Sequence, residues 1–212
     1  MNEETATLTT DAVTGVVLAG GRATRMGGRD KGLVPVNGKP MIEHVLAALT
    51  PQVGGLMINA NRNRHVYESY GHTVFGDDLE DYQGPLAGMA GAMARASTPL
   101  ILTVPCDGPL IPSDLARRLL EALNAAGAAV AVAHDGERLQ PVYALLRTDL
   151  ADSLRAYLDS GERKIDRWYR QLNMTTVDFS DQPELFLNIN TPADRDRLGQ
   201  RMGGAESAGS EP

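Results

Sequence analysis

The sequence predicts an α/β fold, in which a mostly parallel sheet carries helices on both faces, within a single domain that has a small β-hairpin excursion. Short apolar runs alternate with helix-type segments along most of the 212 residues, and no repeat or linker divides them. This length suits one domain with a sizeable core. We expect residues 14–199 to form it, with a disordered extension at 1–13 and a disordered tail at 203–212, because neither end has apolar periodicity.

Strand candidates are short runs of apolar and β-branched residues between turn-forming residues. The first is the buried run Gly15–Ala19, which precedes a glycine-rich loop. The others follow in order at Gly55–Asn59, Thr73–Phe75, Pro99–Val104, Ala128–Ala133 and Gln140–Leu146. Between the last two, Asp135-Gly136 is typical of a hairpin turn.

Helix candidates lie between and after these strands, at Pro40–Leu49, Arg64–Tyr70, Pro85–Ala96, a segment ending at Asn124, Asp149–Leu158, Ile165–Leu172 and a last helix after Thr191. Proline at the first helical position and apolar residues at helical spacing support them. Ser113 or Asp114 is suited to cap the helix that ends at Asn124, and Thr191 is suited to cap the last one.

The composition limits the class of protein. A net charge of −7 argues against general binding to nucleic acid or to a membrane surface, because both require a basic face. The single cysteine, Cys106, allows no internal disulfide, which is typical of a reducing compartment. With no basic leader and no apolar stretch long enough to span a bilayer, we expect a cytoplasmic protein. The four histidines are scattered without a zinc-site pattern.

The loop from Gly20 to Gly38 combines six glycines with basic residues, namely Arg22, Arg25, Arg29 and Lys31, with Lys39 just beyond. Glycines let backbone N–H groups approach a ligand, and nearby cations neutralise phosphate oxygens. Because α/β sheets bind ligands at the C-terminal ends of strands, the loop favours a polyphosphate site over a plain surface loop. Leu33 stands where a Walker loop would continue, and no G-x-G-x-x-G pattern is present.

Asp107 follows an uncharged strand and is therefore expected at the same edge as the glycine loop. A carboxylate beside phosphates would repel them unless a divalent cation lies between, and Mg²⁺ shared by one carboxylate and phosphates is a common arrangement. The alternative, equally favoured by spacing alone, is an Asx turn before Gly108-Pro109. The neighbouring Cys106 is interpreted as a small buried hydrophobe rather than a nucleophile.

Polar side chains end several other strands. Asn59 ends the second strand, and Asp77 follows the third. Such amides and carboxylates can read the polar edge of a base, or they can cap the next helix. Asn188 and Asn190 are two residues apart and would share one face of an extended segment, although Asn190 can also simply precede a cap.

These features together resemble the molybdenum cofactor guanylyltransferases, within the wider nucleotidyltransferase superfamily. The resemblance runs from about Thr14 to Leu198 and rests on the segments LAGGRATRMGGRDKG, VNGKPMIEHV, INANR, DYQGPLAGM, PCDGPLIP, HDGER, AGERK, VDFSD and NINTPAD. It implies a Rossmann-like fold and transfer of GMP from GTP to molybdopterin, with Mg²⁺ as cofactor and pyrophosphate as product. It also implies transient docking to cofactor-insertion proteins or molybdoenzymes.

The resemblance carries GTP contacts onto Leu18, Ala19, Gly20, Lys31, Asn59, Asp77 and Asp107, with Asp107 also the magnesium ligand. Lys31, Arg25 and Asp107 are the expected catalytic residues, and Gly28, Asn188 and Asn190 are weaker carry-overs. Gln140 departs from the family pattern, which puts its role toward the pterin in doubt. The alternatives are a cytidylyltransferase of molybdopterin, a sugar-phosphate nucleotidylyltransferase, and a non-catalytic nucleotide-binding module.

Overall fold

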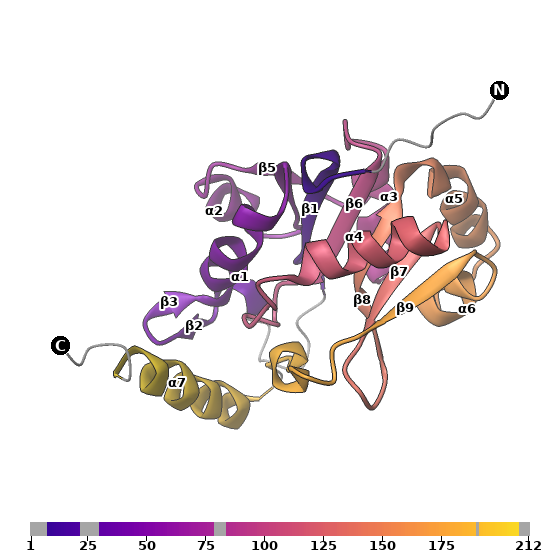
Figure 1. The fold of residues 1–212 in the computed structure, drawn as a ribbon. Helices are drawn as coiled ribbons and strands as arrows, with labels where there is room; N and C mark the ends of the chain where they lie inside the picture. Colours follow the sequence, from indigo (N-terminus) through magenta and orange to yellow (C-terminus); the bar gives the residue numbers. More distant parts are fainter. Residues whose placement is uncertain (1–7, 22–29, 79–83, 190, 208–212) are drawn as a thin grey trace.

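The computed structural model describes residues 8–21, 30–78, 84–189 and 191–207. In these ranges a seven-stranded sheet has the order β5-β4-β1-β6-β8-β7-β9, and a two-stranded hairpin, β2–β3, stands apart from it (Figure 1). The strands are β1 Val13–Leu18, β2 Pro35–Val36, β3 Lys39–Pro40, β4 Gly55–Asn59, β5 Thr73–Phe75, β6 Leu100–Pro105, β7 Val130–His134, β8 Leu139–Arg147 and β9 Met174–Asp178.

The sheet is mostly parallel, as the sequence predicts. β1 pairs in parallel with β4 and β6, β4 with β5, and β7 with β9. Only β8 among the seven strands runs the other way, antiparallel to both β6 and β7. The C-terminal ends of the remaining six strands therefore meet at one edge of the sheet. The predicted hairpin is β7–β8, and both of its strands belong to the main sheet.

Helices cover both faces of the sheet, as predicted (Figure 1). β1 shows how the two cores arise, because Val17 packs into one buried cluster and Val16 into the other. The first cluster includes residues of α1, α2 and α4, and the second includes residues of α3, α5 and α6. The helices are α1 Met41–Leu49, α2 Arg64–Glu68, α3 Pro85–Met93, α4 Leu115–Ala126, α5 Ala151–Asp159, α6 Ile165–Tyr169 and α7 Pro192–Ser207.

The chain ends differ from the expected boundaries. Thr10–Ala12 form a 3₁₀ turn and β1 begins at Val13, so these residues of the expected extension are ordered. Leu8 packs on the first core cluster, and the amide of Gly54 donates to the Thr10 carbonyl at 3.1 Å. These contacts fix the backbone before β1. At the other end α7 continues to Ser207, into the expected tail.

Two strand regions are absent from the sequence-based prediction. β9 at the sheet edge and the hairpin β2–β3 are short, and neither carries a strong apolar alternation. Pairing with β7 makes Met174–Asp178 a strand. His44 holds the small hairpin against α1, because its Nε2 lies 3.0 Å from the Val36 carbonyl oxygen.

The cap of α7 is confirmed, whereas at α4 only the predicted N-cap position of Asp114 is confirmed. Thr191 Oγ1 accepts from the Asp194 amide, and Asp194 Oδ2 accepts from the Thr191 amide, a reciprocal capping box. Asp114 occupies the N-cap position of α4 without a capping hydrogen bond and pairs with Arg117 at 3.0 Å.

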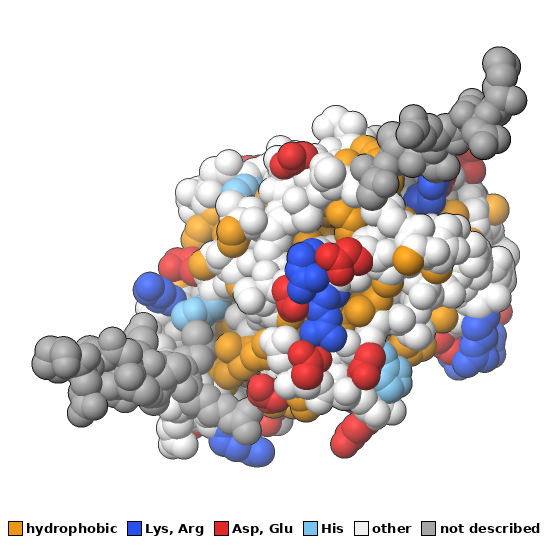
Figure 2. Space-filling view, viewed as in Figure 1, with side chains coloured by type: hydrophobic (Ala, Val, Ile, Leu, Met, Phe, Trp, Pro, Cys, Tyr) orange, Lys and Arg blue, Asp and Glu red, His pale blue; other side chains and the backbone are white. Residues whose placement is uncertain are grey.

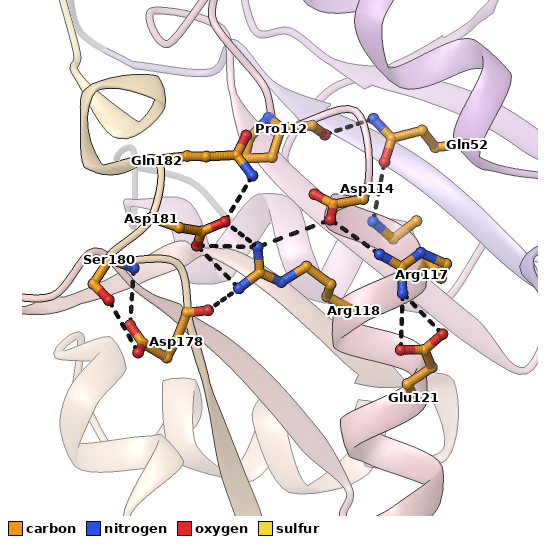
Figure 3. Close-up of polar contacts among 11 residues, drawn as sticks. Gln52, Pro112, Asp114, Arg117, Arg118, Glu121, Asp178, Ser180, Asp181 and Gln182 are labelled. Atoms are coloured by element: carbon orange, nitrogen blue, oxygen red, sulfur yellow. Dashed lines mark hydrogen bonds and ion pairs between the residues drawn. The ribbon is translucent and has the colours of Figure 1, made fainter.

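The buried side chain of Gln52 caps α4 from a distant part of the chain (Figure 3). Its Oε1 accepts from the Ala116 amide at 3.1 Å, and its Nε2 donates to the carbonyls of Ala48 and Pro112, each at 2.9 Å.

The exposed side of α4 carries basic and acidic side chains next to one another (Figure 2). Among the described residues, no helix is both long and apolar enough to cross a membrane.

Candidate active site

The ends of β1, β4 and β6 form the centre of the C-terminal edge. Leu18 is in register with Asn59 on one side and Pro105 on the other. The Ala19 amide donates to the Asn59 carbonyl at 2.8 Å, and the Leu18 carbonyl accepts from the Cys106 amide at 3.1 Å. These bonds fix the predicted Leu18-Ala19-Gly20 segment at the middle of the edge. The same bonds occupy the N–H group of Ala19 and the carbonyl of Leu18, two residues that the resemblance marks as GTP contacts.

Asn59, Asn61 and Asp77 lie beside this segment at the ends of β4 and β5. We call them the base cluster, because the sequence makes Asn59 and Asp77 candidates to read a nucleotide base. Asn59 Nδ2 donates to Asp77 Oδ1 at 2.9 Å, and Asn61 Nδ2 donates to Asp77 Oδ2 at 2.7 Å. Asn61 Oδ1 accepts from the Asp77 amide at 2.7 Å. Two amides therefore orient one half-buried carboxylate, and each carboxylate oxygen retains a lone pair for a further donor.

Asn59 supports this carboxylate from the protein interior, since only 2% of its surface is exposed. A Cβ atom at position 20 would stand 2.8 Å from Asn59 Oδ1, so the close approach of the loop to this amide requires Gly20. Asn61 also donates to the Gly20 carbonyl at 3.1 Å. Sequence reasoning did not select Asn61 as a site residue, although its place two residues after Asn59 puts both on one face.

Lys31 and Asp107 are brought together from residues far apart in the chain. Lys31 Nζ lies 2.7 Å from Asp107 Oδ2, and both side chains are largely shielded from solvent. Asp30, next to Lys31, accepts from the Tyr67 hydroxyl at 2.6 Å and from Asn63 Nδ2 at 3.1 Å. Burial raises the pKa of Tyr67, and the hydrogen bond to the Asp30 carboxylate and its charge raise it further, so this hydroxyl keeps its proton and donates a hydrogen bond to Asp30. These bonds anchor the end of the glycine loop.

Cys106-Asp107-Gly108, here called the Asp107 turn, has little free space around it. The Asp107 carbonyl accepts from the Ile189 amide at 2.8 Å. A Cβ atom at position 108 would stand 2.0 Å from Tyr143 Oη and 3.2 Å from Asn188 Oδ1. The Tyr143 hydroxyl is buried and has no hydrogen-bond partner among the described residues. The structure thus places Asn188 beside the Asp107 turn.

Other candidate residues have structural contacts. Cys106 is buried, and burial raises the pKa of its thiol, so it is a poor nucleophile at neutral pH. Gln140 Nε2 donates to Asp135 Oδ2 at 2.5 Å, and the amides of Glu137 and Arg138 donate to Asp135 Oδ1. Gln140 therefore stabilises the β7–β8 turn.

Three predicted residues, Arg25, Gly28 and Asn190, lie outside the residues that the structure describes. Within the described ranges, no three histidine, cysteine or carboxylate side chains gather into a metal-binding group. A cavity of about 430 Å³ lies between residues 187–189 and α7. It is lined by Leu187, Asn188, Ile189, Asp194, Arg197, Leu198 and Gln200.

An oriented carboxylate and a lysine–aspartate pair at the C-terminal edge of a mostly parallel sheet stand where α/β folds bind nucleotides, as a nucleotidyltransferase must. Residues 15–175 match the MobA-like NTP transferase domain. Two curated relatives, from Shewanella pealeana and Shewanella frigidimarina, are each named molybdenum cofactor guanylyltransferase. The first is 49% identical over 92% of this chain and 98% of its own length. The second is 52% identical over 88% of this chain and 95% of its own length.

The fold has close structural relatives as well. The crystal structure of molybdopterin-guanine dinucleotide biosynthesis protein A from Archaeoglobus fulgidus superposes with a TM-score of 0.77. The superposition covers 90% of this chain and 99% of the Archaeoglobus chain. The two sequences are 22% identical, so this comparison shows a shared fold. The chain is an enzyme that belongs to the MobA-like NTP transferase family, together with the molybdenum cofactor guanylyltransferases to which it is half identical.

Proposed function

We propose that this enzyme transfers the GMP part of GTP to the phosphate of molybdopterin or Mo-molybdopterin and releases pyrophosphate. The names of its relatives support this acceptor and this nucleotide. The structural observation that carries the proposal is that the base cluster and the Lys31–Asp107 pair lie at one edge of the sheet, at strands on either side of β1, where they offer contacts for a guanine and for phosphates.

The Asp77 carboxylate is the proposed reader of the base. Guanine presents two adjacent donors, N1–H and the N2 amine, whereas cytosine and adenine do not present this pair. A carboxylate is an acceptor only, and Asn59 and Asn61 hold it in place, so it matches the guanine edge. In this proposal Asn59 acts through Asp77, and the Leu18–Gly20 backbone lies against the nucleotide.

Lys31 is the proposed partner of the triphosphate, because its flexible stem lets the ammonium follow phosphate oxygens as their charge changes. Arg25 and Gly28 are proposed to assist from the glycine loop. Asp107 is the proposed magnesium ligand, with Asn190 as a candidate second ligand. Mg²⁺ is commonly held by one or two protein carboxylates together with substrate phosphates, so the carboxylate of Asp107 fits it without a larger cluster of ligands. When bound, the ion neutralises negative charge on the phosphates.

The transfer balances without a protein nucleophile. An oxygen of the acceptor phosphate, already ionised at neutral pH, attacks the α-phosphorus of GTP. The bond from the α-phosphorus to the bridging oxygen breaks, and pyrophosphate leaves with that oxygen. Positioning and charge neutralisation are therefore the main requirements, and the inert thiol of Cys106 is compatible with them.

The acceptor is proposed to enter beside Asn188, from the cavity between residues 187–189 and α7. Its polar lining includes Asn188 and Arg197, which offer donors to an anionic acceptor. We further propose cytoplasmic action and transient docking with the proteins that insert the finished cofactor.

Incubation with GTP, Mg²⁺ and molybdopterin, followed by mass detection of the dinucleotide, tests the function directly. Competition between GTP and CTP then distinguishes the guanylyl from the cytidylyl reaction. A preference for CTP, or transfer only to a sugar phosphate, would replace the proposal by one of those activities. Binding of GTP without any pyrophosphate release in the presence of acceptor would favour a non-catalytic module.

A further inference from the structure

The chain between β9 and α7 reaches the Asp107 turn with little regular structure of its own. This connecting segment, residues 179–189, contains one 3₁₀ turn, Pro183–Phe186. At its far end the Ile189 amide donates to the Asp107 carbonyl, and Asn188 lies next to Gly108. Such a segment needs contacts elsewhere in the molecule to hold these residues in place.

Arg118, in the first turn of α4, binds the start of the connecting segment (Figure 3). Its Nη1 donates to Asp181 Oδ1 at 3.1 Å and Oδ2 at 3.0 Å, and its Nη2 donates to the Asp178 carbonyl and to Asp181. The guanidinium also lies over the Phe179 ring, with 4.0 Å from Cζ to the ring centroid. We call these contacts the Arg118 clamp. The planar guanidinium makes all of them together, which a point charge does not.

An aromatic chain connects the clamp to the Asp107 turn. Phe179 meets Phe186 edge-on at 5.3 Å between ring centroids, and Phe186 meets Tyr143 at 4.9 Å. All three rings are buried. The Tyr143 hydroxyl in turn occupies the space beside Gly108. Close-packed rings deform little, so a displacement of Phe179 is transmitted toward the turn that carries Asp107.

We infer that Arg118 is a positioning residue that, through the connecting segment, holds Asn188 beside Asp107 for transfer to the acceptor. The inference rests on the proposed function. Arg118 and the base cluster belong to different halves of the site, because the base cluster lies at the ends of β4 and β5, and β1, β6 and β8 separate these strands from β7 and β9. Loss of Arg118 should therefore impair transfer and leave GTP binding intact, which a general loss of stability would not do.

The neighbouring Arg117 provides a matched control, since it lies on the same turn of α4 and shares Asp114 with Arg118, but has Glu121 as its other partner. In Arg118→Ala we expect kcat/KM for the acceptor to fall by about tenfold to a hundredfold, the cost of small misplacements in an active site. The Kd for GTP, measured without Mg²⁺ so that Asp107 holds no metal, should stay within about twofold of wild type, because the base cluster is untouched. Arg118→Lys should recover only part of the loss, and Arg117→Ala should match wild type.

Amide hydrogen exchange gives a readout that does not depend on turnover. The Ile189 amide should exchange faster in Arg118→Ala than in Arg117→Ala, because its bond to the Asp107 carbonyl is no longer held in place. If Arg118→Ala folds poorly, Asp181→Asn can be used in its place, because it removes the carboxylate that Arg118 binds. It should likewise speed exchange of the Ile189 amide and lower kcat/KM for the acceptor. Equal exchange and equal transfer in the Arg118 and Arg117 variants would overturn the inference, as would a parallel loss of GTP affinity. A wild-type protein that transfers no GMP would overturn the proposed function, while the exchange comparison still decides the clamp.

Discussion

Lys31 Nζ and Asp107 Oδ2 are 2.7 Å apart, although 76 positions separate the two residues in the chain. This ion pair joins the glycine loop to the end of β6. Each partner neutralises the charge of the other. In the proposed function, a nucleotide that binds Lys31 would compete with Asp107, and a cation held by Asp107 would leave Lys31 to pair with phosphate.

Competition within this pair makes the two single variants differ. In a magnesium-free buffer, Asp107→Ala should bind GTP as tightly as wild type or more tightly, because Lys31 no longer pairs with Asp107. Lys31→Ala should bind more weakly and with less salt dependence. With Mg²⁺ and acceptor, Asp107→Ala should lose most of its kcat, a barrier increase of about 3–4 kcal/mol if it removes one main charge-stabilising group. Calorimetric Kd values and steady-state rates test this, and normal kcat at saturating Mg²⁺ in Asp107→Ala would contradict the metal assignment.

The base cluster predicts how guanine preference is lost. Asp77→Asn replaces a pure acceptor by an amide, so the N1–H and N2 donors of guanine lose a partner. The kcat/KM ratio of GTP to inosine triphosphate, which lacks the N2 amine, should fall by about 10²-fold or more, since sites built on such bonds discriminate strongly. Asp78→Asn is the control, because Asp78 pairs with Arg95. If the ratio of kcat/KM for GTP to that for inosine triphosphate is the same in Asp77→Asn and Asp78→Asn, Asp77 does not take part in base recognition.

Gly108 and Tyr143 predict a suppressor pair. A methyl group at position 108 would lie 2.0 Å from Tyr143 Oη, so Gly108→Ala should displace the Asp107 turn and lower kcat. Tyr143→Phe removes that oxygen, and the nearest remaining atoms are then Asn188 Oδ1 and the ring carbon Cζ, both at 3.2 Å. The double variant should therefore recover most of the activity, which a double-mutant cycle measures. Additive losses in that cycle would show that the two positions act independently.

Gln52 predicts an effect on stability alone. Gln52→Leu leaves the Ala116 amide and the Pro112 carbonyl without their partner in a buried place, which should cost about 1–3 kcal/mol. Urea unfolding monitored by circular dichroism measures the change. Replacing the exposed Gln171 by Leu should stay within about 0.5 kcal/mol of wild type. A neutral Gln52→Leu would mean that water replaces the cap.

Asp181 predicts a pKa that reports the Arg118 clamp. Hydrogen bonds from Arg118, then from Gln182, lower the pKa of this carboxyl to about 2. Because the folded value is depressed, the stabilising contribution is present above the unfolded pKa of about 4 and is lost as the pH falls toward 2. In Arg118→Ala the pKa should rise toward the unfolded value, whereas Arg117→Ala should leave it low. Carboxyl-carbon NMR titration measures the pKa of Asp181 in both variants. If this pKa stays at its wild-type value in Arg118→Ala, Arg118 does not hold the carboxylate in solution.

Local patterns in the sequence predicted the parallel sheet and most of its elements. The apolar runs became β1, β4, β6 and β7, because a strand in the middle of such a sheet is largely buried on both faces and so is apolar along most of its length. The Thr191 cap also follows from neighbouring residues, since its reciprocal bonds reach only to Asp194. The α4 cap did not follow, because Gln52 is brought to it by packing between distant segments.

By itself the sequence determined which residues stand at strand ends, and hence that Lys31, Asn59, Asp77 and Asp107 belong to one edge of a sheet. That step needs only the alternation of apolar and polar residues and the rule that parallel strands end together. The tertiary structure alone decided the pairing at this edge: Asn59 and Asn61 on Asp77, Lys31 on Asp107, and Arg118 on Asp181. Such pairings depend on distances of a few ångströms between segments remote in the chain, which local patterns do not encode.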